Sequence, residues 1–283
     1  MWRAVPLAQR AEGEVFSVEP EVVSPEPIPE TSLAERTVAD MLPIATTSAE
    51  AVRLRDSVPV WFHTFALGHG IYTPGLARDH VYRLPVLGAE RFAGRSVLDV
   101  GAFDGFYSFL AERRGARRVV AVDNEQYVDW VQARFGISLT GGAGFHAIAA
   151  VLDSNVDYQR MDALDVRSLG ERFDLVLCFG ILHRVTDPIA LLRALADVLT
   201  PAGELIIETY GSHLSGDTPA VEVHQPGEVY QRDDFVYWGF PAEGLRRLAR
   251  IAGLIDVEGM AAPDIDGHPR LLAILRSGEP SGT

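Results

Sequence analysis

The stretch Val97-Leu98-Asp99-Val100-Gly101-Ala102-Phe103-Asp104-Gly105-Phe106-Tyr107-Ser108-Phe109 decides the fold of this chain. Its apolar start predicts a buried strand, its two glycines predict a tight turn, and the residues after them predict the start of a helix. We expect a Cβ at Gly101 or Gly105 to hold a ligand away from the backbone, and the free N–H groups of the helix N-terminus to face the anionic end of that ligand. The pattern predicts a site for a small-molecule cofactor.

A second strand indicates that this cofactor contains a nucleoside. The run Arg118-Val119-Val120-Ala121-Val122 is apolar and ends in Asp123, eighteen residues after Gly105. An acidic side chain at this place accepts hydrogen bonds from ribose hydroxyls. The fingerprint for dinucleotides is G-x-G-x-x-G, whereas Ala102-Phe103-Asp104 separates the two glycines here, and this interval fits a pyrophosphate poorly.

Three further strand and helix signals follow in order. The segment 156–163 predicts a short strand, after which Asp162 is placed to accept the adenine amino group and Met161 to pack on the ring, or Asp162 simply caps a helix. The segment 173–184 predicts a buried strand with a polar end, followed by a helix over 189–199 that Pro188 starts and Thr200-Pro201-Ala202-Gly203 stops. A fifth strand is expected over 204–209. This alternation predicts an α/β fold with a parallel, doubly wound sheet and a ligand at the carboxyl ends of its strands.

The pattern Asp-x-Gly-x-x-x-Gly at Asp99 to Gly105 resembles the first motif of class I S-adenosylmethionine (SAM) methyltransferases. The resemblance implies a Rossmann-like sheet, mostly parallel with an antiparallel last strand, an N-terminal helical cover, and S-adenosyl-L-methionine as cofactor. It assigns cofactor binding to a set of residues in these motifs, which are Asp99, Gly101, Ala102, Phe103, Gly105, Tyr107, Asp123, Asn124, Met161, Asp162, Ala163, Phe179 and Gly180.

Within this class the chain resembles the family of the bacterial tRNA wobble-uridine carboxymethyltransferase, over roughly residues 58–276. The likeness rests on short segments of the chain, which are Phe62-His63-Thr64-Phe65, Gly68-His69-Gly70, Thr73-Pro74-Gly75, residues 180–184, Gly203-Glu204-Leu205 with Glu208-Thr209, and Gly267-His268-Pro269-Arg270. That family binds a carboxylated SAM, whose extra carboxylate is held by a lysine, a tyrosine and an arginine.

The chain departs from this family where the extra carboxylate would bind. It contains no lysine, Leu182 stands at the tyrosine position, and only Arg270 matches. Burial of an unpaired carboxylate is costly. We therefore expect ordinary SAM and methyl transfer.

The charge of the chain disfavours a nucleic-acid substrate. Its 25 basic and 39 acidic residues give a net charge of −14, which repels a polyanion on average. The arginines at 113, 114, 117 and 118 follow the first predicted helix of the sheet domain, where cations favour the helix dipole, and are interpreted as structural. The leading hypothesis is a methyltransferase for a small, aromatic or secondary-metabolite acceptor. A tRNA-modifying enzyme and a noncatalytic SAM-binding regulator are the alternatives.

Composition and segment boundaries complete the expected organisation. Apolar residues make up 47% of the chain, Cys178 is the single cysteine and is expected to pack in a strand, and no apolar run has 18 residues. These features predict a cytoplasmic enzyme without a membrane span. We expect a disordered acidic arm over 1–30, a helical and aromatic cover over 31–94 that begins with a capping box at Ser32-Leu33-Ala34-Glu35, and a methyltransferase domain over 95–283. The sequence does not decide the oligomeric state.

Candidate residues for the acceptor come from three parts of the chain. His183, at the end of the fourth strand, is the candidate general base, with a simple cofactor contact as the alternative. A long connection over 210–241 is expected to form half of the acceptor pocket. No metal is assigned, because the spacing of His213, Glu222 and His224 matches no helix or hairpin pair. The proposed acceptor contacts are His63, Tyr72, His213, His224, Tyr230, Trp238 and Arg270.

Overall fold

The computed structural model describes residues 32–76, 80–229, 233–261, 263–265 and 267–278. The acidic arm predicted over 1–30 lies outside these residues, and so does Tyr230. None of the helices in the described part of the chain is long and apolar enough to cross a membrane.

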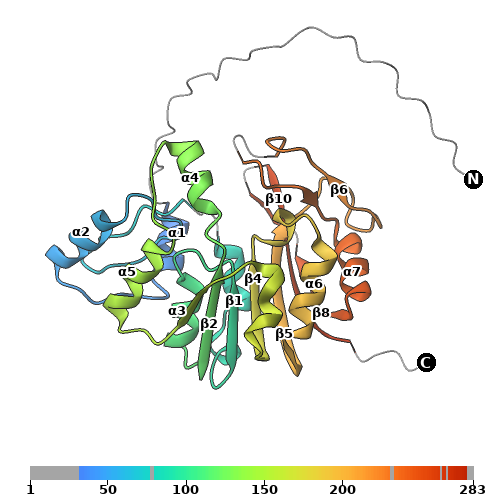
Figure 1. The fold of residues 1–283 in the computed structure, drawn as a ribbon, viewed down its shortest axis with the longest axis horizontal. Coiled ribbons are helices and arrows are strands. Elements are labelled where there is room, and N and C mark those ends of the chain that lie inside the picture. The colour runs from blue at the N-terminus through green and yellow to red at the C-terminus, as the bar shows by residue number, and fades with distance from the viewer. Residues whose placement is uncertain (1–31, 77–79, 230–232, 262, 266, 279–283) are drawn as a thin grey trace, which may run out of the picture.

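A single large sheet organises the molecule (Figure 1), with strand order β3-β2-β1-β4-β5-β10-β8 and β9 paired to β10. Strands β1 to β5 run parallel, whereas β10 is antiparallel to both β5 and β8. The expected sheet, mostly parallel with an antiparallel last strand, is confirmed. The strands are β1 Ser96–Val100, β2 Arg118–Asp123, β3 Asp157–Arg160, β4 Phe173–Phe179, β5 Leu199–Tyr210, β8 Leu254–Ala261, β9 Asp264–Ile265 and β10 His268–Ser277.

The helices lie on both faces and at the ends of this sheet. Figure 1 shows α1, α2 and α5 at one side of the molecule and α6 and α7 at the other. The α-helices are α1 Leu33–Ala39, α2 Ser48–Ser57, α3 Phe106–Arg113, α4 Tyr127–Phe135, α5 Ala143–Leu152, α6 Pro188–Asp197 and α7 Ala242–Ile251, and the 3-10 helices are η1 His80–Val86, η2 Ala89–Arg91, η3 Ala163–Leu169 and η4 Leu182–Arg184.

Strands β1, β2, β4, β5 and β10 contribute to two separate cores because their side chains alternate between the faces of the sheet. Along β1, Val97 packs in the core that also contains Phe106 of α3, while Leu98 and Val100 pack in the core that contains Leu191 of α6. Cys178 is fully buried in the second core, as expected of a packing residue. The two cores explain why apolar residues fill the strands without alternation.

Two segment boundaries differ from the sequence prediction. Helix α6 starts at Pro188, where Asp187 accepts the N–H of Ala190, but it ends at Asp197 rather than Leu199. Strand β5 begins at Leu199, because Leu199 already pairs with Phe173, and the segment 200–203 lies in a register irregularity before the regular pairing resumes at Glu204. The predicted stop signal therefore interrupts the strand instead of preceding it.

The N-terminal cover is fastened to the sheet through the glycine turn. Helix α1 begins with the predicted capping box of Ser32 and Glu35. Further along the cover, the backbone N–H groups of Phe62 and His63 both donate to Oδ2 of Asp104, at 2.6 and 2.9 Å. Burial raises the pKa of Asp104 to about 7. The turn after β1 thus holds the cover over the carboxyl ends of the strands.

Replacement of Asp104 by alanine is expected to destabilise the fold by about 2–4 kcal/mol, because two buried N–H groups lose their acceptor. Asp104→Asn is the matched control. Its amide oxygen can accept both hydrogen bonds, and we expect its free energy of unfolding to stay within about 1 kcal/mol of the original. Urea denaturation of both variants measures the free energy of unfolding. Equal losses in the two variants would contradict the role of the Asp104 hydrogen bonds in holding the cover.

The connection over 210–241 forms a small hairpin of β6 Glu222–Val223 and β7 Trp238–Gly239. It is attached to η4 and the residue that follows it by two hydrogen bonds, from the Tyr237 N–H to the His183 carbonyl at 2.9 Å and from the Trp238 indole N–H to the Val185 carbonyl at 2.7 Å. This connection, called the insert below, therefore packs beside the end of β4, where the sequence predicted His183.

Candidate cofactor and acceptor site

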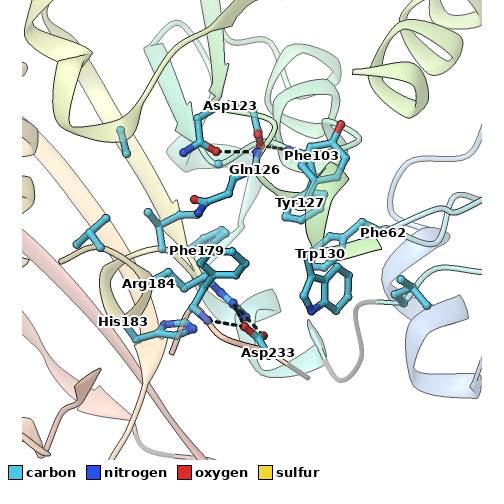
Figure 2. A pocket seen from close by; sticks show the side chains of 18 of the residues that line it. Phe62, Phe103, Asp123, Gln126, Tyr127, Trp130, Phe179, His183, Arg184 and Asp233 are labelled. Atoms are coloured by element: carbon cyan, nitrogen blue, oxygen red, sulfur yellow. Dashed lines mark hydrogen bonds and ion pairs between the residues drawn. The ribbon is translucent and has the colours of Figure 1, made fainter. Parts of the chain in front are cut away.

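A cavity of about 680 Å³ opens at the carboxyl ends of the strands, between the cover, α4 and the insert. This volume lies in the range of about 300–1,000 Å³ that is typical of small-molecule pockets. Figure 2 shows Asp123 at the top of the cavity, Phe62 and Trp130 at one side, and His183 with the Arg184–Asp233 pair at the bottom. Its walls include many of the predicted site residues, which are Asp99, Gly101, Phe103, Tyr107, Asp123, Asn124, Met161, Asp162, Ala163, Phe179, Gly180, His183, His63 and Arg270.

The structure adds a reason for the two glycines of the turn after β1. Gly101 and Gly105 have φ of 78° and 79°, a region that favours glycine. A Cβ at Gly101 would collide with Ile181, and one at Gly105 would collide with the ring of Phe145. Packing within the protein therefore already requires glycine at both positions, and the expectation that a Cβ would displace the ligand stays a prediction. Gly105 and Ala102 do not belong to the cavity wall.

Asp123 closes the glycine turn and faces the cavity. Its Oδ2 accepts the N–H of Phe103 at 2.9 Å, and its Oδ1 accepts the N–H of Glu125 at 2.6 Å. Each carboxylate oxygen has capacity for a second hydrogen bond. Burial raises the pKa of Asp123 to about 6, which means that the ionised carboxylate is destabilised in the free site. A ligand with hydroxyl donors can stabilise it.

Asp162 caps a helix, which is one of the two roles that the sequence left open, and its contact with adenine stays a prediction. Its Oδ1 accepts the N–H of Leu164 and caps η3, while its Oδ2 accepts the side-chain amide of Asn124 at 3.2 Å. Met161 and Ala163 line the cavity beside it. The strand end thus presents a polar edge and an apolar thioether, a combination that suits an adenine ring.

The affinity for the cofactor is expected to depend on pH through the carboxyl groups of Asp99 and Asp123. Burial raises the pKa of Asp99 to about 6 although its Oδ2 accepts the Ser108 hydroxyl at 2.6 Å, and Asp123 has a pKa of about 6 as well. SAM is cationic at its sulfonium and ammonium groups, so it favours the ionised carboxylates. We expect constant affinity above about pH 7 and a loss of up to about tenfold per pH unit for each carboxyl below pH 6.

Isothermal titration with SAM across this range measures the effect. The variant Asp99→Asn should retain the dependence due to Asp123 and lose that of residue 99. An affinity that is independent of pH, or that rises on acidification, would contradict these roles.

Aromatic side chains build the wall of the cavity on the side of the cover and α4. The rings of Phe62 and Phe103 stack with centroids 3.8 Å apart, and Tyr127 contacts Phe103 from α4 at 4.3 Å. Trp130 of α4 also lines the cavity (Figure 2). Sequence reasoning did not assign Tyr127 or Trp130, because α4 follows β2 and carries no motif that distinguishes a pocket-facing aromatic from a core one.

A buried charge network lies at the bottom of the cavity. Glu208 of β5 is fully buried and binds Arg83 of η1 at 2.6 Å and Arg270 of β10 at 2.5 Å. Arg83 also donates to the Tyr107 hydroxyl at 2.9 Å, and its guanidinium lies 4.8 Å from the ring centroid of Phe179. The two arginines lower the pKa of Glu208 to about 2, against the effect of burial. Arg83 is a site residue that the sequence analysis missed.

His183 lies beside this network with a defined tautomer. Its Nδ1 accepts the backbone N–H of Tyr210 at 3.1 Å and lies 3.2 Å from the Thr209 hydroxyl. A ring nitrogen that accepts an N–H carries no proton, so the proton of the neutral imidazole is on Nε2. Burial and the neighbouring arginines hold the pKa of His183 well below its usual range. This arrangement leaves a neutral imidazole with its N–H at Nε2, and the general-base role of His183 stays a prediction.

Several predicted acceptor residues lie away from the cavity. The Tyr72 hydroxyl donates to Asp40 within the cover, and the Trp238 indole N–H donates to the Val185 carbonyl. His213 and His224 are not part of the cavity wall. The insert instead contributes Phe235, Tyr237 and Asp233, whose carboxylate pairs with Arg184 through both oxygens at 2.9 Å. Spacing alone could not show which side of the hairpin faces inward.

Two of the four arginines at 113, 114, 117 and 118 are engaged in ion pairs. Arg117 binds Asp174 at 2.9 Å, and Arg118 binds Glu171 at 2.6 Å and Asp157 at 3.0 Å. These contacts agree with a structural interpretation of Arg117 and Arg118. Within the part of the chain that the structure describes, no group of three or more His, Cys, Asp or Glu side chains could hold a metal ion.

The strand order, the glycine turn after β1 and the acidic residue that ends β2 define a class I SAM-dependent methyltransferase architecture. The donors and acceptors around Asp123 and Asp162 suit a nucleoside cofactor of this kind. Residues 72–258 match the family model described as a methyltransferase domain, and the chain belongs to this family. Its cofactor is S-adenosyl-L-methionine.

Curated relatives show the same resemblance over part of their length. The chain is 34% identical to the tRNA U34 carboxymethyltransferase of Alteromonas mediterranea over 48% of this chain and 38% of that protein. It is 35% identical to the ubiquinone biosynthesis O-methyltransferase of Ruegeria pomeroyi over 44% of each. The match spans 34–52% of the length of five tRNA U34 carboxymethyltransferases.

Solved structures share the fold. The 1,6-didemethyltoxoflavin-N1-methyltransferase of Burkholderia thailandensis, solved with 1,6-didemethyltoxoflavin and S-adenosylhomocysteine, is 21% identical with a TM-score of 0.53, over 69% of this chain and 76% of that chain. The N-terminal domain of EvdMO1 with SAH bound is 19% identical with a TM-score of 0.57, over 83% of this chain and 98% of that chain.

Proposed function

We propose that the chain transfers a methyl group from SAM to a small-molecule acceptor. The observation that carries this proposal is the single cavity that extends from Asp123 and Asp162 to Arg83 and His183, with the cover and the insert as its outer walls. Such an arrangement encloses both a nucleoside cofactor and a small second molecule. Aromatic walls from Phe62 and Trp130 suit a planar acceptor.

The chain's own residues contribute by binding, alignment and exclusion of water. When bound, SAM supplies an electrophilic methyl group on a sulfonium. Asp123 and Asp162 hold the nucleoside at one end of the cavity, and the stacked pair of Phe62 and Phe103 excludes water from one wall. Alignment of the acceptor in line with the methyl group then lowers the barrier, and His183 donates a hydrogen bond rather than removing a proton.

A tRNA wobble-uridine carboxymethyltransferase remains the second candidate, because specific observations favour it. Curated relatives of that name match the chain, and Arg83 joins Arg270 at the bottom of the cavity, where a carboxylated cofactor would need positive charge. The net charge of −14 and the lack of lysine weigh against a tRNA partner. A noncatalytic SAM-binding regulator would bind the cofactor without turnover.

Two measurements separate these functions. Calorimetric competition between SAM, carboxy-SAM and NAD identifies the cofactor, and native mass spectrometry shows which of them accompanies the purified protein. Transfer of labelled methyl from SAM is then compared between tRNA and a panel of small aromatic acceptors. We expect SAM to bind most tightly and the label to appear in a small molecule. Label in tRNA, tighter binding of carboxy-SAM, or no transfer to any acceptor would contradict the proposal.

A further inference from the structure

Two buried N–H donors in the wall of the cavity have no acceptor among the residues that the structure describes. One is Nε2 of His183, which carries the ring proton because Nδ1 accepts the Tyr210 N–H. The other is Nε of Arg83, whose terminal nitrogens are already engaged by Tyr107 and Glu208. His183 is fully buried and Arg83 is 5% exposed. Both residues line the cavity.

Strand β5 brings these donors to the same end of the cavity. Glu208 fixes the guanidinium of Arg83, and the next two residues, Thr209 and Tyr210, fix the imidazole of His183. A buried N–H without an acceptor costs about 1–3 kcal/mol. A fold that holds two of them rigidly in a ligand cavity regains this free energy when the ligand supplies an oxygen.

The electrostatic surroundings indicate the charge of that oxygen. Arg83, Arg184 and Arg270 all lie close enough to His183 to disfavour its protonation. The carboxylates that pair with them are Glu208, which serves both Arg83 and Arg270, and Asp233, which serves Arg184. Three guanidinium groups and a neutral N–H donor around two carboxylates favour a negative group in the ligand.

We propose that Arg83 and His183 form a subsite for a carboxylate group of the methyl acceptor, placed at the end of the cavity away from Asp123. This inference rests on the proposed function and names the substrate class of the same site. The subsite selects anionic acceptors and fixes their orientation toward the cofactor. An anionic acceptor is compatible with the net charge of −14, because Arg83, Arg184 and Arg270 provide local positive charge at this end of the cavity.

Binding of small probes to the full chain saturated with S-adenosylhomocysteine tests the subsite. The probes are matched pairs of an acid and its neutral amide, namely benzoate with benzamide, 2-naphthoate with 2-naphthamide, and acetate with acetamide. Calorimetry is expected to show that at least one carboxylate binds about tenfold or more tightly than its amide, because the charged oxygen pairs with both donors.

Substitutions separate the donor role from packing. His183→Asn places an amide oxygen near the former Nδ1, which can still accept the Tyr210 N–H, but it removes the donor at Nε2. His183→Gln places an amide N–H near the former Nε2. Arg83→Lys keeps the charge next to Glu208 and removes the Nε donor. Arg95→Lys is the matched control, because Arg95 binds Glu204 of the same strand at 2.9 Å outside the cavity wall.

We expect His183→Asn and Arg83→Lys to reduce the preference for the carboxylate by about tenfold, with His183→Gln restoring most of it and Arg95→Lys leaving it unchanged. All variants should keep their affinity for S-adenosylhomocysteine, which reports a folded cofactor site. Equal affinity for acids and amides across all pairs, or a preference that survives both substitutions, would overturn the subsite while the proposed function stands.

The source of the carboxylate is tested separately with the cofactor. Tighter binding of carboxy-SAM than of SAM, with a difference that disappears in Arg83→Lys and His183→Asn, would place the anion on the cofactor and overturn the assignment to the acceptor. Failure of the original protein to bind S-adenosylhomocysteine would overturn the proposed function and, with it, this inference.

Discussion

Replacement of Asp123 by alanine is expected to weaken the binding of SAM by about 10²–10⁴-fold. The carboxylate is placed to accept two ribose hydroxyls, and each hydrogen bond to a charged group contributes about 1.5–3 kcal/mol. The same side chain accepts the backbone N–H groups of Phe103 and Glu125, so its loss also removes the contacts that shape the glycine turn. Calorimetric titration of the variant with SAM measures the loss.

Asp157→Ala is the matched control for this substitution. Asp157 lies on the neighbouring strand β3, its side chain is 38% exposed, and it binds Arg118 away from the cavity. The control removes the same charge from the protein, and an exposed ion pair of this kind contributes little to stability. We expect its affinity for SAM to stay within about twofold of the original protein. Equal losses in both variants would show that net charge, rather than contact with the ribose, governs binding.

Replacement of Glu208 by alanine is expected to lower the free energy of unfolding by about 3–5 kcal/mol. The substitution leaves Arg83 and Arg270 without the carboxylate that binds both of them, and an uncompensated buried charge is strongly destabilising. Urea denaturation of the cofactor-free protein measures the change. If the alanine variant does not fold, Glu208→Gln keeps the side-chain oxygen and should show a smaller loss in the same direction.

Glu204→Ala is the control on the same strand. Glu204 binds Arg91, Arg95 and Arg276. Arg91 is 15% exposed in its side chain and its contact is long at 3.3 Å, whereas Arg95 and Arg276 are 34% and 48% exposed and can return to water when the carboxylate is removed. We expect a loss of about 1 kcal/mol for this variant. A larger loss at Glu204 than at Glu208 would contradict the importance of the buried network.

Acidification should reduce the stability that Glu208 contributes through Arg83 and Arg270. The arginines hold the pKa of Glu208 at about 2, below its usual value of 4.5. A carboxyl whose pKa is lowered in the folded protein contributes stability that is present above pH 4.5 and is lost as the pH falls toward 2. The difference in stability between the original protein and Glu208→Gln should therefore shrink over this interval.

The charge of the whole chain was a poor guide to the charge of its cavity. The sequence predicted from the net charge of −14 that polyanions are repelled, and from the missing lysine and from Leu182 that an extra carboxylate lacks two of its three partners. The structure places Arg83 at the bottom of the cavity, through a contact with Glu208 that joins residues 125 positions apart. A contact between residues so distant has no pattern in a linear sequence.

The residues themselves determined the strands, the glycine turn and the cofactor end of the site, because these depend on local patterns. Apolar runs form strands, and Asp123 and Asp162 follow strand ends, so the shared edge of a parallel sheet brings them together. Only the tertiary structure decided the opposite end of the cavity, where we propose that the acceptor binds. The orientation of the insert placed Tyr237 and Asp233 inward and Trp238 against Val185, and the packing of β5 against His183 fixed its tautomer. These outcomes depend on contacts between distant segments, whose geometry is set by packing and hydrogen bonding rather than by spacing.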